Sequence, residues 1–131
     1  MPDPEPLVID ASAVVDLLLA GQRSARIADR VRHAELHAPA NLDAEVLSAL
    51  ARLHRAGVLT AAQVPGRLRR LADAPIGRHA LADLLEGVWQ RRHSLRVVDA
   101  LYVELAEQIG TTVVTTDRGM GTADHAELIV D

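Results

Sequence analysis

The sequence contains no cysteine and no lysine. Without cysteine, the 131-residue chain forms no disulfide and offers no thiolate ligand to a metal ion. Without lysine, all 14 basic residues are arginine, which binds carboxylates and phosphates through a planar, permanently charged group. Any cation site or charge-based binding surface must therefore be built from carboxylates, imidazoles and guanidinium groups.

Aromatic residues are almost missing as well. There is no phenylalanine, and Trp89 and Tyr102 are the only aromatic residues of the chain. This composition argues against a sheet that stacks nucleic-acid bases on several rings. The formal net charge of −4 does not by itself indicate nucleic-acid binding, although a net charge says nothing about local positive patches.

Long apolar runs are also absent. None reaches the roughly 20 residues that a membrane-spanning helix needs. The N-terminal sequence MPDPEP is acidic and proline-rich, unlike the positively charged start of a signal peptide, and residues 1–6 are expected to form a flexible tail. We therefore expect a cytoplasmic protein, with residues 1–131 forming a single domain.

Apolar and β-branched segments alternate with amphipathic ones along the chain. This alternation predicts an α/β domain with a central, mainly parallel β-sheet flanked by helices. Strands are expected at 7–10, 36–39, 76–81, 111–116 and 126–130. Helices are expected at 12–20, 23–33, 42–57, 82–93 and 97–110, with a further helical stretch after Thr60.

Several residues predict where these helices begin and end. Ser12 and Asn41 are expected to cap two helices, and Gly21, Gly57 and Gly110 to end three. The segment 64–66, Val-Pro-Gly, interrupts the stretch after Thr60. There the helix either kinks or restarts with a proline in its first turn.

Four acidic residues are expected at one edge of this sheet. Asp10 ends one predicted strand and Asp117 follows another, at the carboxyl ends where parallel sheets bind ligands. Glu45 and Asp99 fall in the first turns of predicted helices, where each alone is explained as a partner of the helix dipole. Asp117 alone is explained as a turn former, but an acid ending a buried strand, like Asp10, needs a partner.

Together the four acids predict a cation site. Two like charges about 4 Å apart repel by about 4 kcal/mol at an effective dielectric constant of 20, so a fold that gathers acids needs a cation to offset the repulsion. Carboxylate oxygens without histidine or cysteine suit the hard cations Mg²⁺ and Mn²⁺. Such ions commonly act on phosphate esters.

The segments VIDASAVVDLLL, DAEVLSALARL and VVDALYVELAEQIGTTVVTTDRGM carry a family resemblance in their order and spacing. Together they resemble PIN-domain proteins, and more closely the VapC ribonuclease toxins of bacterial toxin–antitoxin pairs. The resemblance covers essentially the whole chain and implies a Mg²⁺- or Mn²⁺-dependent endoribonuclease. It departs from the usual pattern at residues 64–66, which puts the shape of the middle helices in doubt.

The resemblance also assigns roles to individual residues. It implies that the four acids, Asp10, Glu45, Asp99 and Asp117, are catalytic and hold the metal. Ser12 and Thr115 match hydroxyl residues that orient the first acid or a water molecule, although Thr115 is equally explained by β-propensity. Arg118 fits the pattern as a phosphate contact or as a solvent-exposed residue.

The resemblance further implies an RNA substrate, a small VapB-like antitoxin whose segment covers the acids, and a homodimer. The segment from residue 67 to residue 96 contains seven arginines and only three acids, which gives a local excess of positive charge beside the predicted site. Arg91 and Arg92 in this segment are candidate RNA contacts. The alternative is a solvated helix face.

Two other classes of function compete with a nuclease. One is a PIN-like module that binds RNA or protein without cleaving, which the presence of all four acids argues against. The other is a phosphotransfer domain with an aspartate at a strand end. Those domains also use a lysine, which this chain lacks, and the dehalogenase type needs a second aspartate at the position that Ser12 occupies.

Overall fold

Five parallel strands form the central sheet of residues 3–131, the part of the chain that this computed structural model describes. Their spatial order is β3-β2-β1-β4-β5, and every neighbouring pair is parallel. Parallel strands need crossover connections, which the helices supply. The strands are β1 (Glu5–Ile9), β2 (Ala34–Pro39), β3 (Ile76–His79), β4 (Val113–Thr115) and β5 (Ala126–Leu128). The predicted α/β class with a mainly parallel sheet is confirmed.

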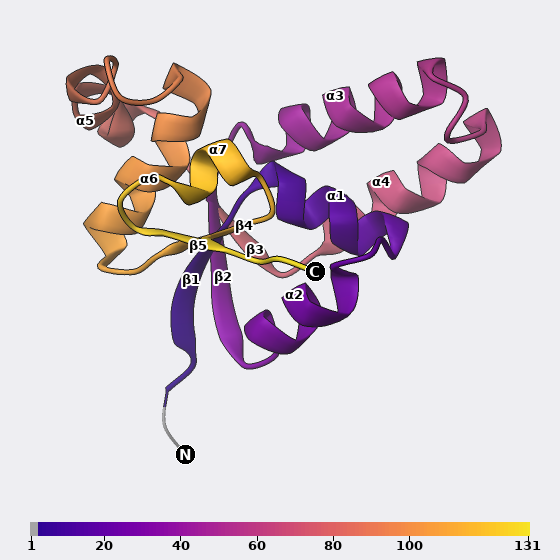
Figure 1. The fold of residues 1–131 in the computed structure, drawn as a ribbon, viewed down its shortest axis with the longest axis horizontal. Helices are drawn as coiled ribbons and strands as arrows, with labels where there is room; N and C mark the ends of the chain where they lie inside the picture. The colour runs from indigo at the N-terminus through magenta and orange to yellow at the C-terminus, as the bar shows by residue number, and fades with distance from the viewer. Residues whose placement is uncertain (1–2) are drawn as a thin grey trace.

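Helices cover both faces of this sheet (Figure 1). On one side lie α1 (Ala11–Leu19), α2 (Ser24–Val31), α3 (Leu42–Arg55) and α4 (Val64–Asp73). On the other side α6 (Val97–Ile109) packs against β1, β2 and β4, and α5 (Leu85–Gln90) packs on α6. Short 3-10 turns, Ala61–Gln63 and Ala82–Leu84, precede α4 and α5.

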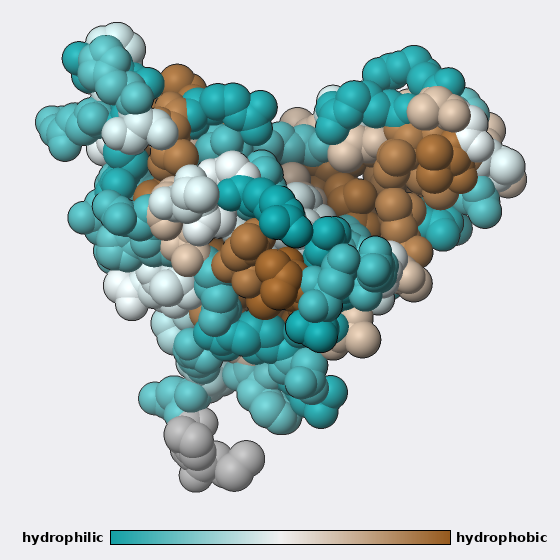
Figure 2. Space-filling model, viewed as in Figure 1, coloured by the Kyte–Doolittle hydropathy of each residue, from teal (hydrophilic) through white to brown (hydrophobic). Residues whose placement is uncertain are grey.

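Two arms project beyond the carboxyl ends of the strands (Figure 1). The α3–α4 pair forms one arm and the α5 region forms the other. The space-filling view shows that the surface is hollowed between them (Figure 2). We call this hollow the notch, and β1 and β4 both end at its floor.

The core explains why the strands at the centre of the sheet are so apolar. Leu7, Val8 and Ile9 of β1 and Val113 and Val114 of β4 are fully buried, because helices cover both faces of a parallel sheet. On α3, Val46 and Leu50 turn the same face to the core as Leu42, and all three are fully buried. Each such side chain contributes about 1.5–3 kcal/mol by leaving water.

Three predicted caps differ from the structure in detail. Asp10, not Ser12, is the N-cap of α1, and its carboxylate accepts a hydrogen bond from the Ala13 amide. Asn41 does stand at the N-cap of α3, but its side chain makes no capping bond there. At the end of α1 the left-handed residue is Ala20, with φ of 50°, rather than Gly21.

The ends of the other helices agree better with the sequence. Gly110, with φ of 85°, is the left-handed cap of α6 as predicted, and Gly57 has φ of 79° just after α3. After Thr60 the helix restarts, rather than kinks, with Pro65 in the first turn of α4. A capping box between Thr60 and Gln63 precedes the restart.

Two further expectations need correction. Of the predicted flexible tail, residues 1–2 lie outside the described residues, whereas Glu5 and Pro6 belong to β1 and pair with β2. The loop expected after Asp117 contains a short helix, α7 (Arg118–Gly121). Within residues 3–131, no helix is long and apolar enough to cross a membrane.

Candidate metal centre at the floor of the notch

Asp10 lies where β1 passes into α1, and it is 4% exposed. Its amide still belongs to the sheet and donates to the carbonyl of Val114 at 3.2 Å. Its carboxylate Oδ1 accepts from the Ala13 amide at 3.0 Å, so the same residue ends a strand and starts a helix. Burial raises the pKa of Asp10 above its ordinary value, and the hydrogen bonds that it accepts oppose this rise.

Two hydroxyl groups hold the Asp10 carboxylate from either side. Ser12 Oγ donates to Oδ1 at 2.8 Å, and the fully buried Thr115 Oγ1 donates to Oδ2 at 2.6 Å. Backbone amides fix both hydroxyls in turn: that of Thr116 donates to Ser12 Oγ, and that of Asp117 donates to Thr115 Oγ1. The network joins β1 to β4 and restricts the Asp10 carboxylate to one orientation.

Glu45 reaches the notch from the first turn of α3. Its Oε2 accepts two hydrogen bonds, from Asn41 Nδ2 at 2.6 Å and from Tyr102 Oη at 2.5 Å. Burial raises the pKa of Glu45, the bond from Tyr102 opposes this rise, and the charges of Asp99 and Asp10 add to it. The pKa of Tyr102 is raised by burial and by the Glu45 carboxylate, so its hydroxyl keeps the proton that it donates.

Asp99 lies in the first turn of α6, and its side chain is 16% exposed. Arg96, one turn earlier, donates to both of its oxygens, at 3.0 and 3.3 Å. The Arg96 side chain is 78% exposed, so this ion pair faces solvent and contributes little to stability.

Asp117 follows β4 and is the N-cap of α7, where its Oδ1 accepts from the Gly119 amide at 2.9 Å. The turn-forming role of Asp117 is thus confirmed, and Asp117 is at the same time close enough to Asp10 to influence it electrostatically. Its negative charge contributes to the raised pKa of Asp10, after the larger effects of burial and hydrogen bonding.

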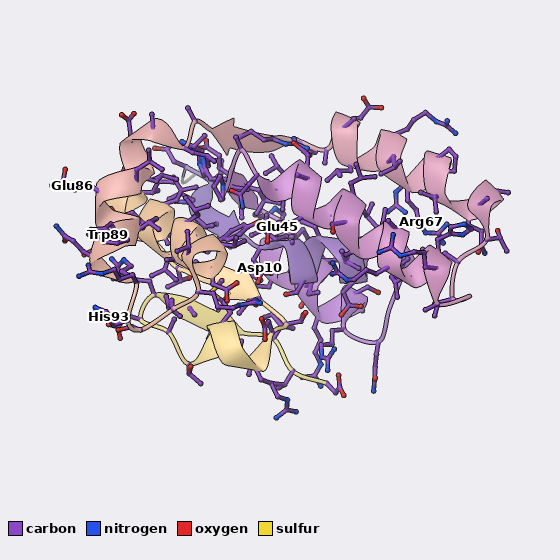
Figure 3. The ribbon with its side chains drawn as sticks, turned by 90° about the horizontal axis from the view of Figure 1, so that it is seen from above. Asp10, Glu45, Arg67, Glu86, Trp89 and His93 are labelled. Atoms are coloured by element: carbon purple, nitrogen blue, oxygen red, sulfur yellow. The ribbon has the colours of Figure 1, made fainter. Side chains whose placement is uncertain are left out.

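The fold therefore brings all four predicted acids into one neighbourhood. In the view from above, Asp10 and Glu45 lie near the middle of the molecule, far from Trp89 on one arm and Arg67 on the other (Figure 3). Among residues 3–131, however, no three acidic, histidine or cysteine side chains are grouped closely enough to hold a metal ion as they stand. The Arg96 guanidinium takes both oxygens of Asp99, so binding of a cation by all four acids requires that side chain to move.

A pocket of about 400 Å³ opens beside these acids. Glu45, Ser48 and Arg52 of α3 line one side, and Arg96 and the exposed Val97 and Val98 line the other; Ala11 completes it. The pocket thus combines carboxylate, guanidinium and apolar groups next to the acids.

The candidate RNA-binding arginines differ from one another. Arg91 pairs with Glu104 and Glu107 of α6, so its guanidinium fixes α5 to α6 and is only 21% exposed. Arg92 is exposed and lies 4.3 Å from the ring centroid of Trp89. Arg118 is exposed at the start of α7, next to Asp117.

Three residues of the site were missed as such from the sequence: Asn41, Arg96 and Tyr102. The sequence indicates only a helix cap at Asn41, a basic segment around Arg96 and a rare aromatic residue at Tyr102. A signal did exist for two of them, since Arg96 and Tyr102 lie three residues before and after Asp99, on one helix face. No sequence signal pairs Tyr102 with Glu45, because their contact spans 57 residues.

Comparison with known proteins agrees with this geometry. The family model described as PIN domain matches residues 7–126, a span that contains all four acids. The chain belongs to the PIN-domain family.

Several relatives within the family carry the name VapC. The chain is 50% identical over 121 residues to Ribonuclease VapC3 of Mycobacterium tuberculosis, covering 92% of this chain and 88% of that protein. A crystal structure of M. tuberculosis VapC20, described as a toxin that cleaves the sarcin–ricin loop, matches 95% of this chain and 99% of that one, with a TM-score of 0.70 and 18% identity. A toxin–antitoxin complex from Klebsiella pneumoniae matches 92% and 95%, with a TM-score of 0.65 and 16% identity. At these identities the two structures show the shared fold.

Proposed function

We propose that the chain is an endoribonuclease, the toxin component of a VapBC-type toxin–antitoxin pair, which uses Mg²⁺ or Mn²⁺ to cleave structured RNA. The observation that carries the proposal is the buried Asp10 carboxylate, clamped by two hydroxyls at the floor of the notch with three more acids around it. Half of the aligned residues are identical to those of a protein named a ribonuclease, which supports the same activity.

The donor set fits a hard divalent cation. Its members are carboxylate oxygens from Asp10, Glu45, Asp99 and Asp117; burial raises the pKa values of Asp10 and Glu45, and the charges of neighbouring acids of the set add to both rises. Two changes must precede binding: the carboxylates must approach one another, since no three within residues 3–131 are grouped closely enough as they stand, and the exposed Arg96 side chain must release Asp99. In such a site a divalent cation supplies activation of water for attack on a phosphodiester and neutralises the developing charge.

The other groups around the notch have roles that follow from their contacts. Ser12 and Thr115 keep the Asp10 carboxylate oriented before substrate arrives, so that little reorganisation remains at the moment of reaction. Arg52 and Arg96 line the pocket and Arg118 stands beside Asp117, where each can hold a backbone phosphate. Arg91 is the weakest of the candidate contacts, because its guanidinium already pairs with two carboxylates.

An antitoxin is proposed as the protein partner, and a homodimer as the assembly in the cytoplasm. An antitoxin arginine that reached the acids would replace the cation by simple charge substitution; the pairing of Arg96 with Asp99 shows that a guanidinium fits against one of these acids. The toxin–antitoxin complex from K. pneumoniae shares the fold and is consistent with such a partner. Light scattering on the purified chain tests the dimer, since a monomer has a mass of 14.1 kDa.

The test is incubation of the purified chain with total structured RNA in Mg²⁺, in Mn²⁺ and in EDTA. We expect discrete fragments that require a divalent cation, and the mapped ends will identify the RNA. Metal-dependent products that are equally abundant from every RNA would contradict selectivity. RNA that is bound but never cut, with either cation, would favour the non-cleaving PIN-like module.

A further inference from the structure

Glu45 on α3 and Asp99 on α6 are held by different kinds of hydrogen-bond donor. Its Oε2 accepts both Asn41 Nδ2, at 2.6 Å, and Tyr102 Oη, at 2.5 Å. Within residues 3–131, both hydrogen bonds that the protein donates to the Glu45 carboxylate go to Oε2, and its other oxygen, Oε1, accepts none. One oxygen is therefore saturated by the protein and the other is left for a ligand.

The donor from α6 is deeply buried and precisely placed by the helix. Tyr102 is 1% exposed, and its ring packs in the main hydrophobic core while its hydroxyl reaches Glu45 on α3. It lies three residues after Asp99, so the same face of α6 presents one acid to the notch and steadies another. A buried tyrosine hydroxyl normally has such a partner, and here the partner is a site carboxylate.

The two donors to Glu45, Tyr102 and Asn41, are electrically neutral. A phenol and an amide carry no positive charge at neutral pH, so they fix the Glu45 carboxylate without neutralising it. Arg96, in contrast, fixes Asp99 by placing a positive charge on it, and that charge competes with any cation. Glu45 is thus oriented and still fully available as an anionic ligand.

We propose that Tyr102 is a positioning residue of the metal centre, which with Asn41 holds Glu45 by Oε2 and leaves Oε1 free of protein donors, so that it would be available to a cation. This inference rests on the cation site of the proposed function and assigns a role to a residue outside the acidic quartet. Groups that orient a ligand in this way typically change metal affinity or activity by 10- to 100-fold when they are removed.

The test is Mn²⁺ binding to the full chain by titration calorimetry, for the wild type and Tyr102→Phe. The variant keeps the buried ring and loses only the hydroxyl, so we expect an unchanged fold and about 10-fold weaker Mn²⁺ binding. Under saturating Mn²⁺, kcat for RNA cleavage should fall while KM for RNA stays the same. Thr111→Val is the matched control, because it deletes a hydroxyl that donates to the Pro6 carbonyl instead, and it should bind Mn²⁺ as the wild type does.

A double-mutant cycle separates positioning from a general structural role. In a Glu45→Ala background, Tyr102→Phe should have no further effect on Mn²⁺ affinity, because the residue through which it acts is gone. Equal losses in both backgrounds, or unchanged affinity in Tyr102→Phe alone, would overturn the positioning role while leaving the metal site intact. Absence of Mn²⁺ binding by the wild type would instead overturn the metal site, and this inference with it.

Discussion

Asp10 serves the fold and the site with the same carboxylate. Its Oδ1 caps α1 through the Ala13 amide, and its two oxygens accept the hydroxyls of Ser12 and Thr115. Because these contacts fix its position without any cation, the Asp10 carboxylate itself needs little reorganisation to bind one. The residue at the heart of the proposed chemistry is therefore also a local anchor between β1, α1 and β4.

Asp10→Asn separates these two roles. The amide keeps an oxygen for the Ala13 amide but removes the negative charge, so RNA cleavage should fall by more than the 10- to 100-fold typical of outer-shell changes. Stability without metal should stay the same or rise, because burial raises the pKa of the Asp10 carboxyl and makes its ionised form costly. A clearly lower free energy of unfolding in urea would contradict this reading.

The same raised pKa gives stability a predicted dependence on pH. Since the folded pKa of Asp10 exceeds the unfolded value of about 3.8, the folded chain binds more protons in the window between them. The metal-free wild type should therefore gain stability as pH falls through the folded pKa, and lose it as pH rises. Asp10→Asn should flatten this part of the profile. An identical pH profile in the variant would show that another group is responsible.

Arg96→Gln tests whether the arginine competes with a cation. Removing the guanidinium frees both oxygens of Asp99, and an exposed pair is worth at most about 1 kcal/mol, so Mn²⁺ affinity should rise by up to about fivefold. Titration calorimetry measures this change. Weaker Mn²⁺ binding in the variant would instead make Arg96 a support of Asp99 in its binding position.

At the scale of elements, Arg78 on β3 ties the α3–α4 arm to the sheet. Its guanidinium donates to both oxygens of Asp43 on α3, and to the carbonyls of Leu71, Ala74 and Ile76 around the end of α4. This arginine belongs to the basic segment 67–96, yet it is used to hold structure. The arm that carries Glu45 is thereby fixed relative to the sheet that carries Asp10.

Arg78→Met should lower the free energy of unfolding by about 2–3 kcal/mol. The change keeps much of the apolar stem but removes the guanidinium bonds to the Asp43 carboxylate and to three carbonyls, of which those of Leu71 and Ala74 keep a backbone amide donor. Urea denaturation measures it, with Arg69→Met as the control on the exposed face of α4, expected within about 0.5 kcal/mol of the wild type. Equal stability of the two variants would rule out a stabilising role for the hydrogen bonds that Arg78 makes between the α3–α4 arm and the sheet.

The elements that were predictable from the sequence are those with strong local signals. Hydrophobic patterning sufficed for α3, α6 and β4, and glycine chemistry for the end of α6 at Gly110. The sequence does not predict the short helix α7. It also does not predict the correct N-cap of α1, because Asp10 and Ser12 are both good capping residues and lie only two positions apart. Only the three-dimensional path of β1 into α1 decides between two good capping side chains.

The site was predictable to a similar extent. Its acids follow from strand ends and first helical turns, which is topological information that the sequence carries. The contacts that orient those acids join distant elements, as in the bond from Thr115 to Asp10 across 105 residues. The charge that Arg96 places on Asp99 is local, at a spacing of three residues, but a basic segment alone does not show which arginines face solvent and which face an acid.

At the scale of the whole molecule, the proposed function assigns cation binding to the acids and phosphate binding to the arginines around them. With a net charge of −4, the proposed binding of RNA requires local positive groups, and Arg52, Arg96 and Arg118 lie near the acids. Binding that neutralises phosphates weakens with added salt, with a slope set by the number of phosphates contacted. The salt dependence of RNA affinity therefore measures how many phosphates the arginines contact.

Arg118→Ala should weaken RNA binding about equally for all sequences and reduce the log–log salt slope by about 0.7–0.9, the contribution of one phosphate. Binding is measured in EDTA by fluorescence anisotropy, so that cleavage does not interfere. Arg26→Ala, at an exposed position on α2, is the control and should leave the slope unchanged. A slope that is the same in both variants would place Arg118 outside the RNA-binding surface.

The most direct test of the central claim is single-turnover RNA cleavage in Mn²⁺ by four charge-neutralised variants: Asp10→Asn, Glu45→Gln, Asp99→Asn and Asp117→Asn. Asp73→Asn, at an exposed position at the end of α4, is the matched control. If the four acids form one metal-dependent nuclease centre, all four variants lose most of the cleavage rate and the control keeps it. Wild-type cleavage by the Asp10 or Asp99 variant, or loss of cleavage in the control alone, would contradict that assignment.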